Sequence, residues 1–399
     1  MTAFTVRTLR PDELRRSGDL FRSALHFALV KDDEWVYAER LYQPGRTLGA
    51  FDDELIGTAR SFDAELTVPG GARVAMGAVT GVGVRPDRTR RGVLTGLMRE
   101  QLRDLARREV PLAGLYASEA SIYGRFGYGI GTVSRQYTVD RRRAVLRLEV
   151  PAGGQVTLLS ADAAVRRLPA LYASLPHTRP GTMSRPVYWW PGFERSLRKA
   201  ESPVHTIVHD GPDGPDGFAV YTVDGPSWGE HKSTLDVWHL TAASDEAFAG
   251  LWRYLLSVDL VDRIKMDGPV DDGTELLLTD PRACTVTGVG DGLWLRLVDV
   301  PAALAAREYD GEPVVLEVTD SFLPGNDGRY RVAPDGVART DTPGELSLSA
   351  DTLAMLYLGT WRASALASAG RIRVAEPKAL ARADRLFGVG VSAWCGTHF

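Results

Sequence analysis

The chain has 399 residues, of which 44% are hydrophobic and 25% are charged. This length and balance are typical of a globular protein with two or three domains, each able to bury a core. The formal net charge of −4 gives no reason to expect nucleic acid or a membrane surface as a partner. Cys284 and Cys395 are the only cysteines, which is too few for a disulfide framework, and they lack metal-ligand spacing.

Targeting and metal signals are missing from the sequence. Residues 1–18 carry no apolar stretch behind their charges, and no run elsewhere approaches the ~20 apolar residues of a membrane helix. We therefore expect a cytoplasmic protein. His205 and His209 stand four apart without a third candidate ligand beside them, so we interpret them as surface or core histidines and expect no metal.

The first part of the chain predicts a mixed α/β domain. Apolar residues recur at helical spacing in some segments, and short apolar or alternating runs indicate strands in others. In chain order the patterns predict a helix within 11–30, strands at 47–51, 54–62 and 74–84, a helix over about 92–108, a strand at 112–117, a helix from about 118 and a strand at 134–139. The charged run Arg141–Arg143 is interpreted as a solvated strand end.

After a plausible linker at 151–154 the order of predicted elements partly repeats. The patterns predict a helix around 168–172, strands at 218–223 and 234–240, a helix over 244–256, strands at 263–266 and 293–297, a helix over 299–306, strands at 313–318, 328–332 and 346–348, and helices over 350–358 and 377–387. We therefore predict three domains, at 1–150, 151–294 and 295–399. The repeat suggests a structural duplication without sequence identity between its halves.

The most informative stretch is Thr80-Gly-Val-Gly-Val-Arg-Pro-Asp-Arg-Thr-Arg-Arg-Gly-Val-Leu-Thr95. A strand ends at Val84, a basic loop follows, and a helix begins directly after Gly92. The first N–H groups of a helix lack intrahelical partners, and the helix dipole makes their surroundings positive, so the layout suits a pyrophosphate. Gly92 allows close backbone approach, and Arg90 and Arg91 can add charge-assisted hydrogen bonds.

Other phosphate-binding motifs do not match this stretch. No G-x-G-x-x-G follows the strand, which disfavours a dinucleotide fold, and no G-K-[ST] is present, which excludes a P-loop. The free edge of the strand at Val82, Gly83 and Val84 offers backbone groups to the amides of an extended ligand. A basic loop before an ordinary helix remains the alternative interpretation.

On these residues the stretch resembles the acetyl-CoA-binding motif of GNAT acetyltransferases, Gln/Arg-x-x-Gly-x-Gly/Ala. Thr89 and Leu94 depart from it at the first and last positions, which removes one basic contact and one close backbone approach. The resemblance implies acetyl-CoA as cosubstrate and no metal. It implies that the cosubstrate is bound by Val82, Gly83, Val84, Arg90, Arg91, Gly92, Val93, Leu94, Thr95, Ser118 and Glu119.

A second motif narrows the resemblance. Tyr116-Ala-Ser-Glu-Ala-Ser-Ile-Tyr-Gly-Arg-Phe-Gly-Tyr-Gly129 is similar to the Ser-Glu-x-x-Ile-Tyr-Gly-Arg-Phe-Gly-Tyr-Gly pattern of the Eis-like (enhanced intracellular survival) family. The resemblance extends along the whole chain. It implies an α/β (α+β) protein with two tandem GNAT-like domains and a C-terminal domain like sterol carrier protein, which residues 293–301 and 379–387 fit. It also implies a homo-hexamer built as a trimer of dimers.

The resemblance assigns two proton-transfer roles. Tyr123 is the general acid that protonates the departing thiolate, and its reference pKa of about 10 lies near the ~8.5 of a thiol. The C-terminal carboxylate, here that of Phe399, is the general base, which requires the tail to reach the N-terminal domain. Packing alone remains open for both residues. Glu119 or a water chain is the fallback base, and Ser118 can also serve as a helix N-cap.

The resemblance implies a small-molecule amine as substrate, of the polyamine type that includes aminoglycosides, and some relatives act on lysine side chains. The segment Asp32-Asp33-Glu34-Trp35 can line a cationic cleft or can be a solvated loop. The alternative function is a regulatory protein that holds CoA or a lipid on a GNAT scaffold without catalysis, which the departures at Thr89 and Leu94 favour.

Overall fold

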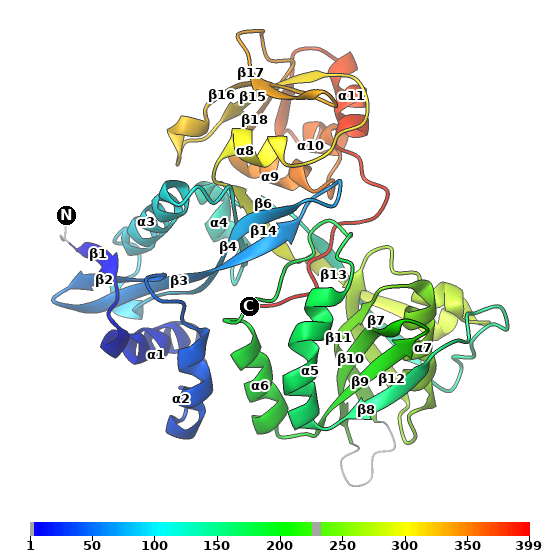
Figure 1. The fold of residues 1–399 in the computed structure, drawn as a ribbon. Helices are drawn as coiled ribbons and strands as arrows, with labels where there is room; N and C mark the ends of the chain where they lie inside the picture. Colours follow the sequence, from blue (N-terminus) through cyan, green and yellow to red (C-terminus); the bar gives the residue numbers. More distant parts are fainter. Residues whose placement is uncertain (1–3, 226–232) are drawn as a thin grey trace. The chain divides into compact units, whose positions relative to one another are not determined.

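A computed structural model describes residues 4–225 and 233–399. The chain forms two compact units. The first contains Met1–Thr132, Thr178–Pro191 and Asp291–Phe399, and the second contains Val133–His177 and Gly192–Gly290. Within the described residues each unit is built on β-sheets, with two sheets in the first unit and one in the second (Figure 1).

The first sheet has the strand order β1-β2-β3-β4-β5-β14-β6. Its strands are β1 Thr5–Thr8, β2 Thr47–Asp52, β3 Glu54–Thr67, β4 Arg73–Val84, β5 Leu112–Tyr116, β14 Leu293–Leu297 and β6 Gly129–Ile130. β4 and β5 are parallel, whereas their other neighbours are antiparallel. A parallel pair needs a crossover connection, and the helix after β4 supplies it.

Helices cover both faces of the first sheet (Figure 1). They are α1 Leu14–Ala24, α2 Asp32–Ala38, α3 Val93–Arg107 and the short α4 Ala120–Tyr123. A Cβ at Gly57 would meet Val93 and Leu97 of α3, whereas a Cβ at Gly83 would meet Phe21 of α1. The glycines of β3 and β4 therefore let the two helices approach opposite faces closely.

The second unit is built on the strand order β13-β7-β12-β11-β10-β9-β8. These strands are β13 Cys284–Asp291, β7 Val133–Asp140, β12 Arg263–Pro269, β11 Thr234–Ala242, β10 Gly214–Asp224, β9 Val204–Gly211 and β8 Gln155–Leu159. The helices are α5 Ala161–Ser174, α6 Trp190–Lys199 and α7 Asp245–Ser257. Trp252 of α7, 1% exposed, packs at the centre of the core beside Tyr137.

The C-terminal part of the first unit has a smaller sheet with the order β17-β16-β15-β18-β19. Its strands are β17 Gly336–Arg339, β16 Gly328–Ala333, β15 Val314–Thr319, β18 Leu346–Ser349 and β19 Ile372–Val374. The helices are α8 Val300–Ala305, α9 Ala350–Tyr357, α10 Ala363–Ser368 and α11 Lys378–Leu386. Short 3₁₀ helices lie at Pro11–Glu13, Glu39–Leu41, Pro86–Arg88, Gly124–Phe126, Thr274–Leu277, Pro281–Ala283 and Pro324–Asn326.

Most predicted elements are present, with shifted ends. The helix predicted within 11–30 ends at Ala24, because His26 adopts a positive φ of 59° that an α-helix cannot continue. The helix predicted from about 118 is only Ala120–Tyr123, and its N-cap is Glu119 without a side-chain bond, so Ser118 is not the cap. Strands β1, β6, β8, β9, β13, β17 and β19 and helices α2, α6 and α10 were not predicted.

The domain boundaries at 150/151 and 294/295 stay predictions. β7, which precedes residue 150, lies in the second sheet, and β14, which includes residue 294, lies in the first. His209 is fully buried in the second unit, where its Nδ1 lies 2.6 Å from Asp216 and its Nε2 lies 3.2 Å from the Gly153 carbonyl oxygen. This histidine therefore belongs to the core.

Candidate functional site

A cavity of about 110 Å³ lies where the ends of β4 and β5 meet α1, α4 and the last residue of the chain. It is lined by Phe21, Leu25, Val79, Thr80, Gly81, Val82, Leu115, Tyr116, Ser118, Tyr123 and Phe399. The lining is mainly apolar, with hydroxyl groups from two tyrosines, a serine and a threonine. Few polar groups in an apolar pocket are typical of a site that binds and orients a small molecule.

β4 is irregular where it borders this cavity. Thr58 of β3 is opposite Gly83, whereas Arg60 is opposite Thr80, so one β3 residue faces both Gly81 and Val82. This is a β-bulge, and Gly81 adopts the positive φ of 61° that favours glycine. A bulge redirects the backbone, here directly at the cavity wall.

β4 and β5 also pair over only part of their length. Their ladder joins Met76–Ala78 to Leu112–Gly114, whereas β4 continues to Val84. The last residues of β4 therefore carry backbone groups toward β5 that lie outside this ladder. An extended ligand with amide groups can pair with such an edge in the manner of an added strand.

The loop after β4 leads into the N-terminus of α3. Arg90 and Gly92 both have positive φ, 60° and 84°, and Gly92 is the N-cap. A Cβ at Gly92 would meet nothing within 4 Å, so the glycine serves the left-handed conformation and leaves the first turn of the helix open. Unpartnered N–H groups at such a turn attract anions.

The arginines of this loop fall into two groups. Arg85 pairs with Glu54 at 2.6 Å, and Arg88 pairs with Asp52 at 2.9 Å. Arg90 and Arg91 are exposed and make no hydrogen bond or ion pair with any residue in 4–225 or 233–399. Their guanidinium groups are therefore uncommitted and lie beside the open helix turn.

Tyr123 is 5% exposed and belongs to a core cluster, yet its side chain also lines the cavity. Burial raises the pKa of its phenol above the ordinary value of 10.0. A hydrogen bond with the Ser118 side chain opposes the rise in pKa, and the charge of Glu119 adds to it. A buried tyrosine that stays neutral while its oxygen faces a cavity can donate a proton there.

Phe126 and Tyr128 are packing residues in the core behind Tyr123. Their side chains are 1% and 0% exposed. Tyr128 forms an edge-to-face pair with Tyr123 at 6.1 Å between ring centroids, and Phe126 forms one with Phe322 at 5.1 Å. These rings fix the position of Tyr123 from behind.

The last residue of the chain lies in this cavity. The Phe399 ring packs edge-to-face on Phe62 at 5.6 Å and on Tyr116 at 5.4 Å. The His398 ring lies 4.4 Å from the Tyr116 ring. The Tyr116 hydroxyl donates a hydrogen bond to the Thr397 carbonyl oxygen at 3.0 Å. The tail is therefore bound to the end of β5, beside Tyr123.

The structure brings four predicted site residues together in the cavity: Val82, Ser118, Tyr123 and Phe399. The others do not line it. Gly83 and Val84 end β4, Arg90, Arg91 and Gly92 form the loop, Val93, Leu94 and Thr95 form the first turn of α3, and Glu119 caps α4. The Val93 side chain is buried against Gly57, which leaves its backbone as the part that can meet a ligand.

Sequence reasoning missed several lining residues. Tyr116 stands first in the quoted Tyr116–Gly129 motif, and its position at the end of an apolar run was the available signal. Phe21 and Leu25 carry only the helical periodicity of a core face, so nothing in the sequence assigns them to the cavity. Phe62 does not line the cavity but packs on the Phe399 ring, and in the sequence it is likewise an ordinary strand residue.

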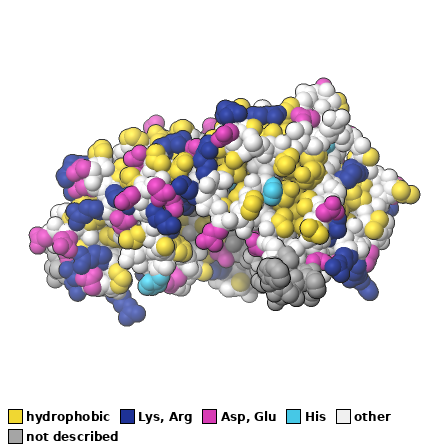
Figure 2. Space-filling model, turned by 90° about the horizontal axis from the view of Figure 1, so that it is seen from below, with side chains coloured by type: hydrophobic (Ala, Val, Ile, Leu, Met, Phe, Trp, Pro, Cys, Tyr) yellow, Lys and Arg dark blue, Asp and Glu magenta, His cyan; other side chains and the backbone are white. Residues whose placement is uncertain are grey.

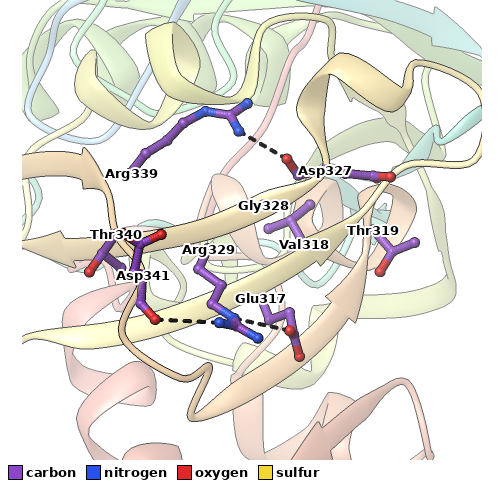
Figure 3. Close-up of a pocket in the computed structure, with 9 residues that line it drawn as sticks. All are labelled: Glu317, Val318, Thr319, Asp327, Gly328, Arg329, Arg339, Thr340 and Asp341. Atoms are coloured by element: carbon purple, nitrogen blue, oxygen red, sulfur yellow. Dashed lines mark hydrogen bonds and ion pairs between the residues drawn. The ribbon is translucent and has the colours of Figure 1, made fainter.

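A second cavity, of about 650 Å³, lies on the smaller sheet and is polar (Figure 3). It is lined by Glu317, Val318, Thr319, Asp327, Gly328, Arg329, Arg339, Thr340 and Asp341. Arg329 reaches Glu317 at 3.2 Å, and Arg339 reaches the Asp327 carbonyl oxygen at 3.0 Å. Charged side chains at this density do not suit a lipid chain.

Two further properties concern the part of the chain that the structure describes. Among the described residues no three His, Cys, Asp or Glu side chains gather as metal ligands, and none of the described helices has the length and apolarity needed to cross a bilayer. Figure 2 shows basic and acidic side chains interspersed on the face that it displays, as the near balance of charges leads us to expect.

Comparison with known proteins settles the family. The chain is 36% identical to the N-acetyltransferase Eis of Mycobacterium tuberculosis over 360 residues, which cover 87% of this chain and 86% of the relative. The chain belongs to the Eis family of GNAT N-acetyltransferases. It is also 38% identical to an uncharacterized N-acetyltransferase of Streptomyces coelicolor, over 97% of this chain and 98% of the relative.

Family models and a solved structure agree with the Eis architecture. Residues 5–131 and 181–297 each match an acetyltransferase (GNAT) domain, and residues 300–396 match a sterol carrier protein domain. The crystal structure of Eis1 from Mycobacterium abscessus is 40% identical, covers both chains fully and superposes with a TM-score of 0.91. The fold predicted from the two motifs is confirmed, and the chain is an N-acetyltransferase.

Proposed function

We propose that this Eis-family enzyme transfers the acetyl group of acetyl-CoA to a primary amine in the cavity shared by Tyr123 and Phe399. The observation that carries the proposal is this shared cavity, which joins a buried tyrosine and the end of the chain at the bulge of β4. Acetyl transfer to an amine needs a donor for the leaving thiolate, an acceptor for the amine proton and a polar group for the carbonyl oxygen.

The cosubstrate would bind along one continuous path. The unladdered end of β4, at Val82, Gly83 and Val84, would pair with the amides of the pantetheine arm. The pyrophosphate would lie on the first turn of α3, at Gly92–Thr95, where N–H groups point outward. Arg90 and Arg91 would add charge-assisted hydrogen bonds. Ser118 and Glu119 would lie beside the thioester end.

The two proton transfers follow from the residues at the cavity. The amine nitrogen attacks the thioester carbonyl carbon and passes a proton to the Phe399 carboxylate. The carbon–sulfur bond then breaks, and the sulfur takes the phenolic proton of Tyr123. Burial keeps that phenol protonated at neutral pH, and the Ser118 hydroxyl stabilises the phenolate that forms when the proton leaves.

The carbonyl oxygen needs a hydrogen-bond donor as the amine adds. The bulge at Gly81 and Val82 exposes backbone to the cavity on the side of β4 that lies outside the ladder with β5. We assign the oxyanion donor to a backbone N–H of this bulge. A fixed backbone donor in a largely apolar cavity stabilises developing negative charge without reorganisation.

The substrate class is inferred from family membership and from the cavity. A polyamine-type acceptor, such as an aminoglycoside, offers several primary amines to one carboxylate. The segment Asp32–Trp35 forms the start of α2 and is not a loop; Asp32 pairs with Arg15 at 3.0 Å, and Trp35 packs on Tyr42. That residues 32–35 line the cleft for the cationic substrate stays a prediction, as do the hexamer and the cytoplasmic location.

A non-catalytic binding protein is the competing function. Thr89 and Leu94 support it, because both depart from the acetyl-CoA motif. Thr89 is exposed, and its hydroxyl donates to the Pro86 carbonyl oxygen at 3.2 Å, which holds the loop closed without a basic side chain. The open first turn of α3 remains, so these departures do not remove the anion-binding geometry.

The two functions differ in whether thiol is released. Purified protein is mixed with acetyl-CoA and a panel of an aminoglycoside, spermidine and lysine peptides, and free CoA is measured with a thiol reagent. The proposal expects release of CoA with at least one amine, and a mass gain of about 42 Da, that of one acetyl group, on the same amine. Tyr123→Phe should lose both the release and the mass gain. Absence of release across the panel would contradict it.

Tyr128→Phe is the matched control. Tyr128 is fully buried beside Tyr123, and its hydroxyl makes no hydrogen bond within the described residues. Removing that hydroxyl disturbs the same aromatic cluster without touching the cavity. Equal loss of release in both variants would mean that the cluster, and not the Tyr123 proton, is required.

A further inference from the structure

The tail that ends in the cavity is held in an extended conformation. Residues 392–399 form no helix or strand, yet burial alternates along them. Ala393, Cys395 and Thr397 are 2%, 3% and 0% exposed, whereas the residues between them are only partly covered. Alternate burial in a segment without a sheet partner means that one side of the tail fits a preformed groove.

A single segment, residues 179–189, supplies most hydrogen-bond partners of the tail. Arg179 donates to the Ser392 carbonyl oxygen at 2.7 Å, and the Trp394 N–H donates to the Pro180 carbonyl oxygen at 2.9 Å. Further along the tail, the donors of this segment are side chains. The contacts thus follow the tail from its start toward the cavity.

The last three hydrogen bonds involve the three residues before Phe399. Arg185 donates from Nε to the Thr397 hydroxyl at 3.1 Å and from Nη2 to the Gly396 carbonyl oxygen at 3.3 Å. The Trp189 Nε1 donates to the His398 carbonyl oxygen at 2.7 Å. The Arg185 guanidinium also lies 4.4 Å from the Trp189 ring centroid. The two side chains therefore form one stacked unit.

This segment is itself fixed to the first sheet. Its residues 182–184 pair with the far end of β3, where the Thr67 N–H donates to the Thr182 carbonyl oxygen and the Ser184 N–H donates to that of Glu65, both at 2.8 Å. β2 pairs with β3 only as far as Arg60, so the segment occupies an edge that β2 leaves open. Met183 is fully buried there.

We infer that Arg185 and Trp189 are positioning residues, which place the carboxylate of Phe399 for proton abstraction from the amine. The inference rests on the proposed role of that carboxylate. A flexible end would sample many conformations, and each fixed carbonyl upstream reduces that freedom. We call the hydrogen bonds from Arg185 and Trp189 to the tail the clamp. The clamp ends at His398, one residue before Phe399. It therefore fixes the backbone that leads to the carboxylate and does not occupy the carboxylate oxygens.

Trp189→Phe is the sharpest test, because it keeps an aromatic ring on Arg185 and removes only the donor to the His398 carbonyl oxygen. Arg185→Lys is the second variant, since an ammonium keeps the charge but cannot donate along the two fixed directions of a guanidinium. Misplacement of a reacting group by about 1 Å can cost about 100-fold in rate. We expect kcat to fall by about tenfold or more in both variants, with KM for acetyl-CoA unchanged within about twofold.

Release of the tail gives an independent readout. Carboxypeptidase removes Phe399 only from a tail that leaves its groove, and intact mass reports the removal. We expect faster removal in both variants than in the wild-type protein. Trp361→Phe is the matched control, because the Trp361 Nε1 makes no hydrogen bond within the described residues. It should match the wild-type protein in kcat and in carboxypeptidase resistance.

The outcomes separate this inference from the proposed function. If Trp189→Phe and Arg185→Lys match the control in kcat, or lose Phe399 no faster, the clamp is wrong. A variant with a residue appended after Phe399 tests the base itself. Loss of turnover there, together with normal turnover in the clamp variants, would overturn only the positioning role. Normal turnover in the appended variant would overturn the carboxylate mechanism instead.

Discussion

The Tyr116 hydroxyl donates a hydrogen bond to the Thr397 carbonyl oxygen at 3.0 Å, between residues 281 positions apart in the sequence. Tyr116 ends β5, the strand that leads into Ser118 and Tyr123. The contact therefore places the end of the chain and the proposed acid at one strand end. Neither residue needs to be near the other in sequence for this geometry to arise, because the first unit contains both ends of the chain.

The pH dependence of turnover should depend on Ser118. Burial raises the pKa of Tyr123, and the hydrogen bond with Ser118 lowers it, so Ser118→Ala should raise the pKa further. Activity requires the protonated phenol, so loss of the acid should begin only above about pH 10 in the wild-type enzyme and at higher pH in the variant. The variant should also be slower at neutral pH, because its phenolate is less stabilised. The measurement is kcat against pH.

An alkaline limb below pH 9 in the wild-type enzyme would contradict this account of Tyr123. Thr80→Ser is a suitable control, because Thr80 also lines the cavity and the substitution keeps its hydroxyl. The control should leave the profile unchanged, which would show that the shift in Ser118→Ala comes from the lost hydroxyl and not from any change of cavity volume.

Arg90 and Arg91 should set the affinity for acetyl-CoA. Both guanidinium groups are uncommitted beside the α3 N-terminus, so Arg90→Ala and Arg91→Ala should each raise the dissociation constant by about tenfold, which is about 1.4 kcal/mol. The effect should shrink at high salt. Titration calorimetry at two ionic strengths measures it. Arg103, exposed further along α3, is the control; equal weakening in Arg103→Ala would point to bulk charge instead.

The buried pair Arg296–Asp320 should contribute strongly to stability. Both side chains are fully buried, and they join β14 to the loop after β15. Arg296→Met should lower the free energy of unfolding by about 3 kcal/mol or more, because it leaves a buried carboxylate without its cation. Asp320→Asn in the same chain should recover part of the loss. Urea unfolding of both single variants and the double variant measures the coupling, and strict additivity would contradict it.

Glu13 should make stability depend on acid pH. Hydrogen bonds from Arg7, at 2.7 and 2.8 Å, and from the Arg10 N–H lower the pKa of its carboxyl to about 2. Because the pKa is lower in the folded state, the charged carboxylate stabilises the fold at pH values above its unfolded pKa of about 4.5. This stabilisation is lost as the pH falls toward 2. Glu13→Gln should therefore lower the free energy of unfolding at pH 7, and the difference should shrink below pH 4.

Denaturant unfolding at pH 7, 4 and 2.5 tests this dependence. Glu109, which is exposed on the loop after α3, gives the control Glu109→Gln, which should change little at each pH. A constant difference between wild-type and Glu13→Gln across the range would mean that the lost contact acts through packing and not through charge.

Regular elements were predictable where the sequence carries a strong period. The α3 helix has an apolar stripe, and β5 is a continuous apolar run, so both were predicted within two residues of their ends. β13 was missed because its glycines and exposed valines give no inward-facing alternation. α6 was missed because Pro191 and Gly192 near its start suggest a loop.

The site was predictable in part for a related reason. Tyr123 and the loop before α3 lie in contiguous motifs, whereas Arg185 and Trp189 have no local pattern and matter only through contacts with residues more than 200 positions later. No periodicity reports a contact of that kind. The tail was singled out by the family resemblance alone, but the groove that receives it could not be predicted.

The most direct test of the central account compares turnover and acetyl-CoA binding in a variant with one glycine appended after Phe399. The account predicts that kcat falls by about 100-fold or more, because the carboxylate is moved away from the amine, while calorimetry gives an unchanged dissociation constant for acetyl-CoA. Turnover equal to that of the wild-type enzyme would contradict it.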